Sequence, residues 1–188
     1  MIDLIIKNLE KRKKIIDIIS KEEFVSKKLF FASQIVKTLS KNKKIIFCGN
    51  GGSAAQSCHM SAELSGRFKK DRKSQKSIVL GSNFSSITSI SNDYSFDKVF
   101  SRELDGIGEK GDMIICYSTS GDSNNIVEVL KTARQKKIKS ILFTGKNIGV
   151  AQKYSDNVYN VPSENTATIQ EIHLIVGHII LDMVDSKL

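Results

Sequence analysis

The chain has 188 residues, a hydrophobic fraction of 40% and a charged fraction of 26%, values typical of one soluble domain with a real hydrophobic core. Its formal net charge is +9, from 29 basic and 20 acidic residues, which favours anionic partners such as nucleic acid or a phosphorylated metabolite. The lysines are spread along the chain without a basic stripe of interleaved aromatic residues, so we expect a lysine-rich solvated surface and no nucleic-acid partner.

Neither the N-terminal residues nor the cysteines indicate export. Residues 1–14 are apolar and then basic, the reverse order of a secretory signal, and no uninterrupted apolar segment is long enough to span a bilayer. Cys48, Cys58 and Cys116 cannot all pair, and their spacing fits neither a disulfide scaffold nor a zinc knuckle. Cys48 and Cys116 lie in apolar runs, where a reduced cysteine packs as a small hydrophobic residue. We expect a cytoplasmic protein with no membrane partner.

Residues 1–42 are predicted to form two helices. Apolar residues recur with near-helical spacing between Ile2 and Ile19, and the S-x-x-E pattern at Ser20 and Glu23 resembles a capping box for the second helix. The apolar positions of that second helix, which cover more than one narrow stripe, are Phe24, Leu29, Phe30, Ile35, Val36 and Leu39. A helix this apolar is often shared with a partner subunit, so we expect this segment to serve in oligomerisation.

Short apolar runs alternate with helical patterns over residues 43–188. The runs predict five strands, at residues 43–48, 76–80, 112–118, 139–144 and 157–161. Helices are expected from near residue 53, around 84–91, over 123–136 and over 166–185. Alternating strands and helices are typical of a parallel sheet covered on both faces. The sequence therefore predicts one α/β domain, a three-layer α/β/α sandwich with a five-stranded parallel sheet, preceded by the N-terminal helices.

Two loops that follow predicted strands carry polar groups suited to an anion. In the first, residues 49–53 (GNGGS), glycines allow close approach to a ligand, and amides at a helix start favour negative charge. It matches neither a dinucleotide fingerprint nor a P-loop, so a purely structural turn stays open. The second, residues 118–123 (STSGDS), offers four hydroxyls and a glycine at a helix start. Simple N-capping is the alternative there, but a cap needs one hydroxyl and four favour phosphate binding.

Possible metal ligands occur on two predicted helices. His59 and Glu63 are four residues apart and share a helical face, whereas Gln170 and His178 are eight apart on the last helix. His59, Glu63 and His178 can ligate zinc if the two helices face each other, and purely structural histidines are the alternative. We assign His173 to packing or to support behind the ligands.

Together these segments resemble the sugar isomerase (SIS) domain family and, within it, the phosphoheptose isomerases. The matching stretches are CGNGGSA (48–54), H-x-x-x-E (59–63) with LSGRF (64–68), Asn92-Asp93, YSTSGDSNN (117–125), ILFTGK (141–146), and VPSENTATIQEIH (161–173) with His178. Glycine-rich and serine-rich loops occur throughout the SIS family, whereas their combination with H-x-x-x-E and IQE-x-H-x-x-x-x-H is more specific. Some relatives carry Asp-Arg where this chain has Ala167-Thr168, so any role of that aspartate is absent here or filled by another residue.

The resemblance implies a flavodoxin-like fold and a homotetramer with active sites at subunit interfaces. It also implies conversion of D-sedoheptulose 7-phosphate into D-glycero-D-manno-heptose 7-phosphate, for the ADP-heptose or GDP-heptose of lipopolysaccharide and capsule biosynthesis. One zinc ion per subunit would be bound by His59, Glu63, Gln170 and His178. The implied substrate contacts are Gly51, Gly52, Ser53, Glu63, Asn92, Asp93, Ser118, Thr119, Ser120, Ser123 and Gln170.

The residue types agree with aldose–ketose isomerisation, which needs a base at carbon and an acid at oxygen. Glu63 is the candidate base and His178 the candidate acid. Zinc would polarise the carbonyl, although a glutamate bound to zinc is a weaker base, so its two roles pull against each other. The main alternative is a non-catalytic SIS protein that binds a phosphosugar or the replication initiator. A non-catalytic protein does not need a base, an acid and a metal site at the same time. The presence of His59, Glu63, Gln170 and His178 therefore favours the enzyme.

Overall fold

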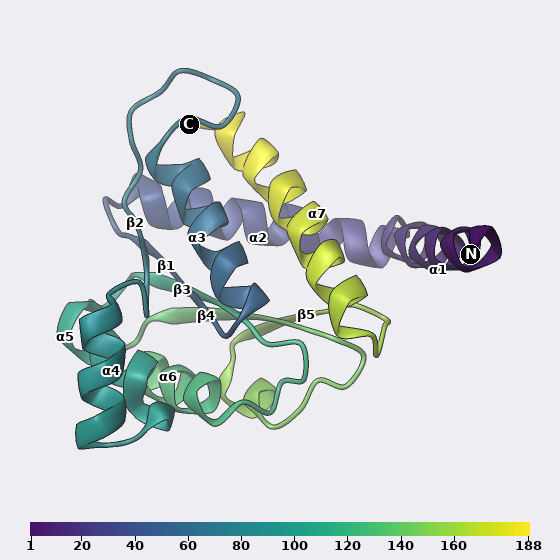
Figure 1. The fold of residues 1–188 in the computed structure, drawn as a ribbon. Coiled ribbons are helices and arrows are strands. Elements are labelled where there is room, and N and C mark those ends of the chain that lie inside the picture. Colours follow the sequence, from purple (N-terminus) through teal and green to yellow (C-terminus); the bar gives the residue numbers. More distant parts are fainter.

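A five-stranded sheet lies between two layers of helices in the computed structural model, which describes residues 1–188 (Figure 1). The strands are β1 (Ile45–Gly49), β2 (Ser77–Val79), β3 (Met113–Tyr117), β4 (Lys139–Thr144) and β5 (Asn157–Asn160). The helices are α1 (Ile2–Ile19), α2 (Glu22–Ser40), α3 (Gly52–Ser65), α4 (Phe84–Asp93), α5 (Val99–Ile107), α6 (Asn124–Gln135) and α7 (Thr166–Asp185), with 3-10 turns η1 (Phe96–Lys98) and η2 (Ala151–Tyr154).

All the strand pairs are parallel, in the order β2-β1-β3-β4-β5. The predicted five-stranded parallel sheet is therefore confirmed. The chain runs outward from β1 to β2 and then crosses to β3 on the other side of β1, so the topology switches between β1 and β3. Ligands of such sheets bind beyond the carboxyl ends of the strands at a switch point. The glycine-rich and serine-rich loops follow these two strands.

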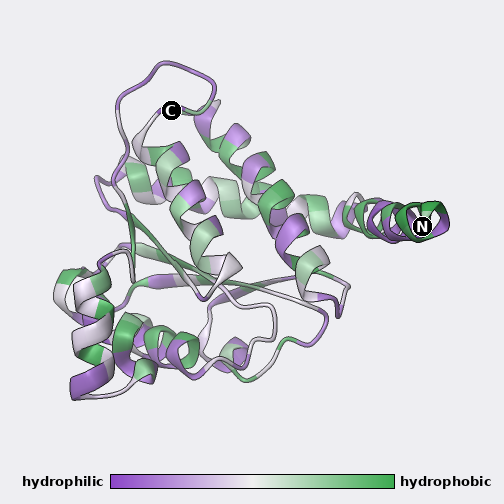
Figure 2. Cartoon of the chain, in the orientation of Figure 1, coloured by the Kyte–Doolittle hydropathy of each residue, from purple (hydrophilic) through white to green (hydrophobic).

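Two hydrophobic cores lie on opposite faces of the sheet, because successive side chains of a strand alternate between faces. Ile45 and Phe47 face α2, α3 and α7, whereas Ile46 and Cys48 face α5 and α6. Cys48 and its neighbour in register, Cys116, are fully buried and unoxidised, which confirms that they pack as core residues. Helix α7 is long and apolar enough to cross a membrane by length and composition, but half of that stretch is buried inside the protein. Figure 2 shows hydrophobic residues along the strands and on α7.

The strand 139–144 and the helix 166–185 have the predicted bounds, and the other predicted elements differ by at most two residues at an end. Helix α5 is absent from the prediction. Its nine residues contain few apolar positions, among them buried Val99, Phe100 and Leu104, which is too short a stretch for clear helical periodicity.

The predicted capping box at Ser20 and Glu23 is wrong. Ser20 ends α1, where its hydroxyl donates to a carbonyl one turn earlier at 2.8 Å, and Lys21 is the N-cap of α2 without a side-chain bond. The helix end is instead satisfied from α2, since the buried Lys28 Nζ donates to the Ile19 carbonyl at 2.7 Å. Burial lowers the pKa of Lys28. A cation at a helix C-terminus is stabilising, so Lys28 fixes the junction between α1 and α2.

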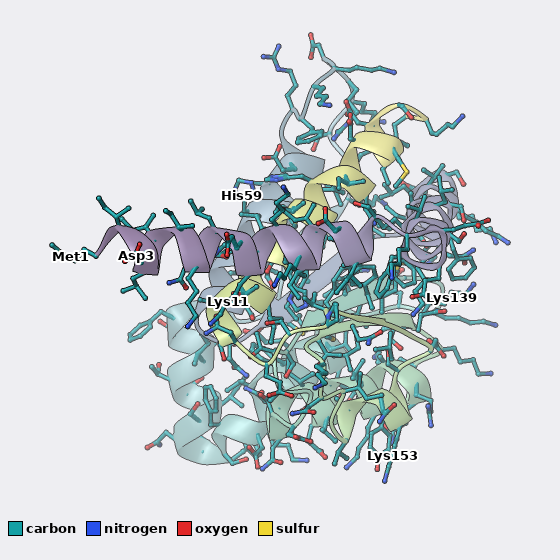
Figure 3. The ribbon with its side chains drawn as sticks, turned by 90° about the vertical axis from the view of Figure 1, so that its right-hand side faces the viewer. Met1, Asp3, Lys11, His59, Lys139 and Lys153 are labelled. Atoms are coloured by element: carbon teal, nitrogen blue, oxygen red, sulfur yellow. The ribbon has the colours of Figure 1, made fainter.

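Helix α1 projects away from the rest of the molecule, with Met1 at its far end (Figures 1 and 3). Its large apolar side chains are exposed: Ile2, Leu4, Ile5, Ile6, Leu9 and Ile16. The Arg12 guanidinium ties it to α7 by two bonds to the Glu171 carboxylate, at 2.6 and 2.8 Å. One chain alone therefore leaves an apolar helix face uncovered.

Candidate active site and metal centre

The glycine-rich loop makes a sharp turn from β1 into α3. Gly51 has φ +55°, a left-handed conformation that glycine adopts readily. A Cβ on Gly49 would lie 2.7 Å from the Cβ of buried Ser53, so this position also has no room for a side chain. The N-cap residue Gly51 places no side chain over the first turn of α3. The amides and dipole of this helix end are suited to an anion.

Two hydroxyls of the serine-rich loop accept hydrogen bonds from amides of the same loop. Ser118 Oγ accepts from the Gly121 amide and Ser120 Oγ accepts from the Asp122 amide, each at 3.2 Å. Ser123 is the N-cap residue of α6, but its side chain makes no capping bond, so simple N-capping by Ser123 is wrong. Thr119 and Ser120 line a cavity of about 190 Å³ with Asp122, Asn147, Ser163, Glu164, Thr166 and Ile169.

A pair of asparagines joins the two loops. The side-chain amides of Asn50 and Asn125 donate to each other's oxygens, both at 2.9 Å, and Asn125 is buried. Asn50 belongs to the glycine-rich loop, and Asn125 lies in the first turn of α6. The pair therefore joins the loop after β1 to the helix that follows β3. Both asparagines lie inside the motifs, but only the sheet order places them opposite each other.

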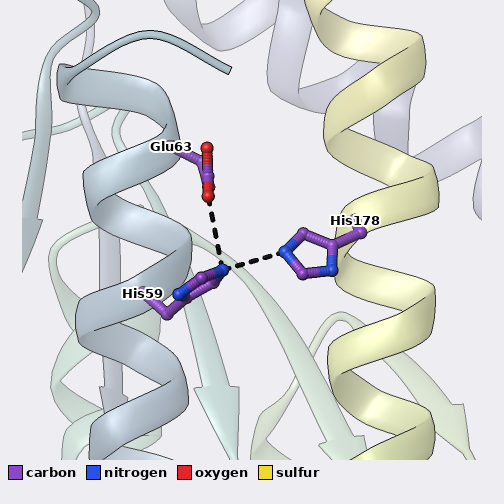
Figure 4. Close-up of side chains that lie close together, drawn as sticks. All are labelled: His59, Glu63 and His178. Carbon is purple, nitrogen blue, oxygen red and sulfur yellow. Dashed lines mark hydrogen bonds and ion pairs between the residues drawn. The ribbon is translucent and has the colours of Figure 1, made fainter. Parts of the chain in front are cut away.

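His59, Glu63 and His178 meet between α3 and α7 (Figure 4). The two Nε2 atoms of His59 and His178 are 2.9 Å apart, and His59 Nε2 is 3.3 Å from Glu63 Oε1. The ring of Phe68 stacks on that of His178 with a centroid separation of 5.9 Å and an angle of 12°. The two helices thus face each other as the zinc interpretation required.

The geometry of these three side chains fits a divalent metal. The three possible ligand atoms lie within 4.8 Å of one another. Tetrahedral zinc with bonds near 2.0–2.1 Å places its ligands about 3.3 Å apart, close to the separations of 2.9 and 3.3 Å here. Two imidazoles and one carboxylate are also a ligand set of catalytic zinc sites that keep one position open.

Gln170 lies beside the glycine-rich loop. A Cβ on Gly52 would be 2.7 Å from Gln170 Oε1, so the Gln170 amide lies directly against this glycine. A cavity of about 340 Å³ is lined by Gly52, Ala55, Gln56, His59, Gln170, Glu171 and Leu174. Gln56, which the sequence interpretation missed, is buried with both amide atoms unpartnered. Polar groups from the loop, from α3 and from α7 therefore converge on one cavity.

The remaining predicted residues lie apart from this cluster. Asn92 and Asp93 end α4 and are exposed, joined to each other by a bond of 3.0 Å. Figure 1 places α4 on the opposite side of the sheet from α3 and α7. Ala167 and Thr168 stand where some relatives carry Asp-Arg. The amide and hydroxyl of Thr168 both donate to Asn165 Oδ1. Thr168 therefore belongs to the cap of α7, and Ala167 carries no polar group.

His173 is a core residue, as expected. Its ring is fully buried, and Nε2 lies 3.1 Å from the Thr144 carbonyl, to which it donates in the neutral ring. Burial lowers the pKa of His173 from 6.5 to about 4. Glu171 has an exposed side chain, but it pairs with Arg12 of the same chain.

The low pKa of His173 predicts acid sensitivity. The unfolded chain binds a proton on His173 near pH 6.5, and the folded chain does so only near pH 4. The contribution of neutral His173 to the free energy of unfolding is therefore present above pH 6.5 and is lost as pH falls through 4. The loss is about 3 kcal/mol. Urea unfolding between pH 4 and 7 checks it, with His173→Gln expected to show a shallower pH dependence. Equal slopes for both proteins would contradict the assignment.

Comparisons with known proteins agree with this geometry. The SIS domain family matches residues 12–145. The chain is 43% identical over 152 residues to a phosphoheptose isomerase of Nitratiruptor sp., covering 81% of each. It is 39% identical over 184 residues to phosphoheptose isomerase 1 of Campylobacter jejuni, covering 92% of this chain and 99% of the relative. Phosphoheptose isomerase structures from Francisella tularensis (TM-score 0.94, 28% identity) and Neisseria gonorrhoeae (TM-score 0.91, 32% identity) each match over 98% of both chains.

Proposed function

Because this chain belongs to the SIS domain family and, within it, to the phosphoheptose isomerases, we propose that it converts D-sedoheptulose 7-phosphate into D-glycero-D-manno-heptose 7-phosphate. The observation that carries the proposal is the meeting of His59, Glu63 and His178, of which His59 lines a cavity together with Gly52 of the glycine-rich loop. The product would enter ADP-heptose or GDP-heptose synthesis for lipopolysaccharide or capsule, in the cytoplasm. Direct assay of this conversion is the test.

The substrate phosphate is assigned to the serine-rich loop. Hydroxyls of Ser118, Thr119, Ser120 and Ser123 bind an anion without burying a fixed positive charge, so the product can leave. The sugar is assigned to Gly51, Gly52, Ser53, Asn92, Asp93 and Gln170. Thr119 and Ser120 line one cavity and Gly52 and Gln170 line another, which supports those assignments, whereas Asn92 and Asp93 line neither cavity.

Proton transfer is assigned to Glu63 and His178. Glu63 takes the proton from C1 of the ketose and returns it to C2, while His178 gives a proton to the C2 carbonyl oxygen and regains one from the C1 hydroxyl as the aldehyde forms. The roles reverse in the other direction. The Glu63 side chain is 20% exposed, so it is shielded yet reachable by substrate. Each correctly placed acid or base contributes about 10² to 10⁴ in rate.

The proposed metal is one zinc ion per subunit, held by His59, Glu63, Gln170 and His178. When bound, zinc polarises the substrate carbonyl and favours negative charge on the enediol oxygen. The protein itself supplies the orientation, because Phe68 stacks on the His178 ring.

Zinc content tests this centre. After dialysis against zinc, the protein is expected to carry about one ion per subunit, and His59→Ala is expected to lower zinc affinity by about 100-fold or more, because one of its few ligands is gone. His173→Gln serves as the control, since this histidine lies outside the cluster and should retain the ion. Full activity in chelator, with zinc shown to be absent, would overturn the proposal.

The proposed assembly is a homotetramer, with active sites at subunit interfaces. Uncovered apolar residues of α1 support it, as does a cavity of about 590 Å³ lined by Leu29, Ala32, Ser33, Val36, Lys37, Ser40, Met183, Ser186 and Lys187. Exposed apolar patches such as that of α1 mark interfaces.

Light scattering tests the assembly. Four chains of 20.9 kDa give an expected mass of about 84 kDa. Leu9→Glu on α1 is expected to lower the mass, because a charge would enter the apolar contact, whereas Lys7→Glu, which replaces one exposed charged side chain by another, should leave the mass unchanged. A mass near one chain for the unmodified protein would contradict the proposed assembly.

A further inference from the structure

The segment of residues 66–76 joins α3 to β2 and passes near the C-terminal end of α7 (Figure 1). Its Arg72 side chain forms an ion pair with Asp185, with Nε 2.6 Å from Oδ1. Both side chains are buried, 7% and 3% exposed. The other carboxylate oxygen of Asp185 accepts from the amides of Lys69 and Lys70, at 3.4 and 3.0 Å. Asp185 thus fastens the whole segment to the last turn of α7.

The same guanidinium also fastens the segment to α3. One terminal nitrogen of Arg72 donates to the Leu64 carbonyl at 3.0 Å, and the other donates to the Glu63 carbonyl at 2.8 Å. Carbonyls in the last turn of a helix have no partner within the helix, so Arg72 supplies donors that the helix lacks. One buried side chain therefore bridges the main chain of Glu63 and the helix that carries His178.

The bridge lies in line with the proton-transfer pair. Asp185 follows His178 by seven residues, about two helical turns, and so lies on nearly the same face of α7. The segment also supplies Phe68, whose ring stacks on that of His178. A buried ion pair contributes little net stability compared with apolar residues of the same size. The contacts of the Arg72–Asp185 pair are better explained by a role in positioning the two helices than by a role in stability.

We propose that Arg72 and Asp185 are positioning residues, which set the separation of Glu63 and His178 by clamping the end of α3 to the end of α7. This inference rests on the proposed metal centre for its first readout. Partners behind metal ligands typically change metal affinity by about 10- to 100-fold when removed. The clamp contacts the main chain of Glu63 and the helix that carries His178. We therefore expect its removal to change metal affinity by about the same 10- to 100-fold.

Cobalt titration of the metal-free full-length protein tests the clamp, because the visible absorption of Co²⁺ reports both affinity and ligand geometry. Asp185→Asn and Arg72→Lys are each expected to weaken Co²⁺ binding at least tenfold and to change the spectrum. Asp182→Asn is the matched control. Asp182 lies on the same last turn of α7 and pairs with Lys69 at 2.6 Å, but those side chains are 48% and 61% exposed. The Co²⁺ affinity of Asp182→Asn should stay within twofold of that of the unmodified protein.

Hydrogen exchange of residues 59–65 in the metal-free proteins separates the two proposals. Exchange there is expected to be faster in Asp185→Asn than in Asp182→Asn or the unmodified protein, whether or not metal binds. If the unmodified protein fails to bind Co²⁺, the metal proposal falls and exchange alone decides the clamp. If Asp185→Asn does not fold, Arg72→Lys decides, because a single ammonium cannot reach Asp185 and both carbonyls together. A folded variant with unchanged exchange and, where Co²⁺ binds, unchanged affinity overturns the clamp.

Discussion

Glu63→Gln is expected to lower kcat for heptose phosphate isomerisation by about 10² to 10⁴. Glutamine keeps the size of the side chain and one hydrogen-bonding oxygen, but it cannot accept a proton from carbon. KM should change far less, because the phosphate is assigned to Ser118, Thr119 and Ser120, which the substitution does not touch. In a Glu63→Gln protein that keeps its zinc, a fall in kcat with little change in KM therefore reports on chemistry more than on phosphate binding.

The control for this experiment is Glu171→Gln. Glu171 lines the cavity beside His59 and Gln170, but its carboxylate is bound by Arg12, so activity should stay within a few-fold. Zinc content must be measured alongside. A variant that keeps its metal and loses turnover identifies Glu63 as the base, whereas loss of both identifies it as a ligand. Undiminished turnover in Glu63→Gln would remove it from the mechanism.

Phe143→Ala is expected to cost about 3–5 kcal/mol of stability, the range for removing a buried aromatic ring. The Phe143 side chain is 2% exposed. Its ring centroid lies 5.0 Å from that of Tyr117, 5.4 Å from Tyr159, 5.6 Å from His173 and 6.1 Å from Phe31. Removing it leaves a cavity in the core beneath α2 and α7, where close-packed neighbours collapse only in part.

Urea unfolding at one fixed protein concentration measures this loss, since subunit association makes stability depend on concentration. Phe84→Ala is the control. Phe84 is 78% exposed, so its removal should change stability by less than about 0.5 kcal/mol. A loss below about 1 kcal/mol for Phe143→Ala would mean that this aromatic cluster does not hold the domain together.

The predictable parts of the fold are those where one local pattern suffices. The strand at residues 139–144 is buried from residue 140 to residue 144, and the helix at residues 166–185 contains no proline, so the local pattern predicts the bounds of both. The shared face of His59 and Glu63 follows from helical spacing in the same way. The predicted capping box at Ser20 is wrong because a serine hydroxyl can bond to the end of one helix or to the start of the next. The S-x-x-E pattern does not distinguish these two cases.

The parts that could not be predicted depend on the order of strands in space. Asn50 and Asn125 meet only because β1 and β3 are neighbours. Arg72 and Asp185 are separated by 113 residues in sequence and meet because α3 and α7 cover the same face of the sheet. Spacing along one helix carries no information on such pairs, and neither does composition.

The most direct test of the central claim is an isomerase assay of the purified, zinc-loaded protein with D-sedoheptulose 7-phosphate. We predict conversion to an aldoheptose 7-phosphate, with proton exchange at the carbon next to the carbonyl visible by NMR in deuterated water. A folded, metal-loaded protein that binds this ketose phosphate without turning it over would contradict the assignment and would favour a non-catalytic phosphosugar-binding protein.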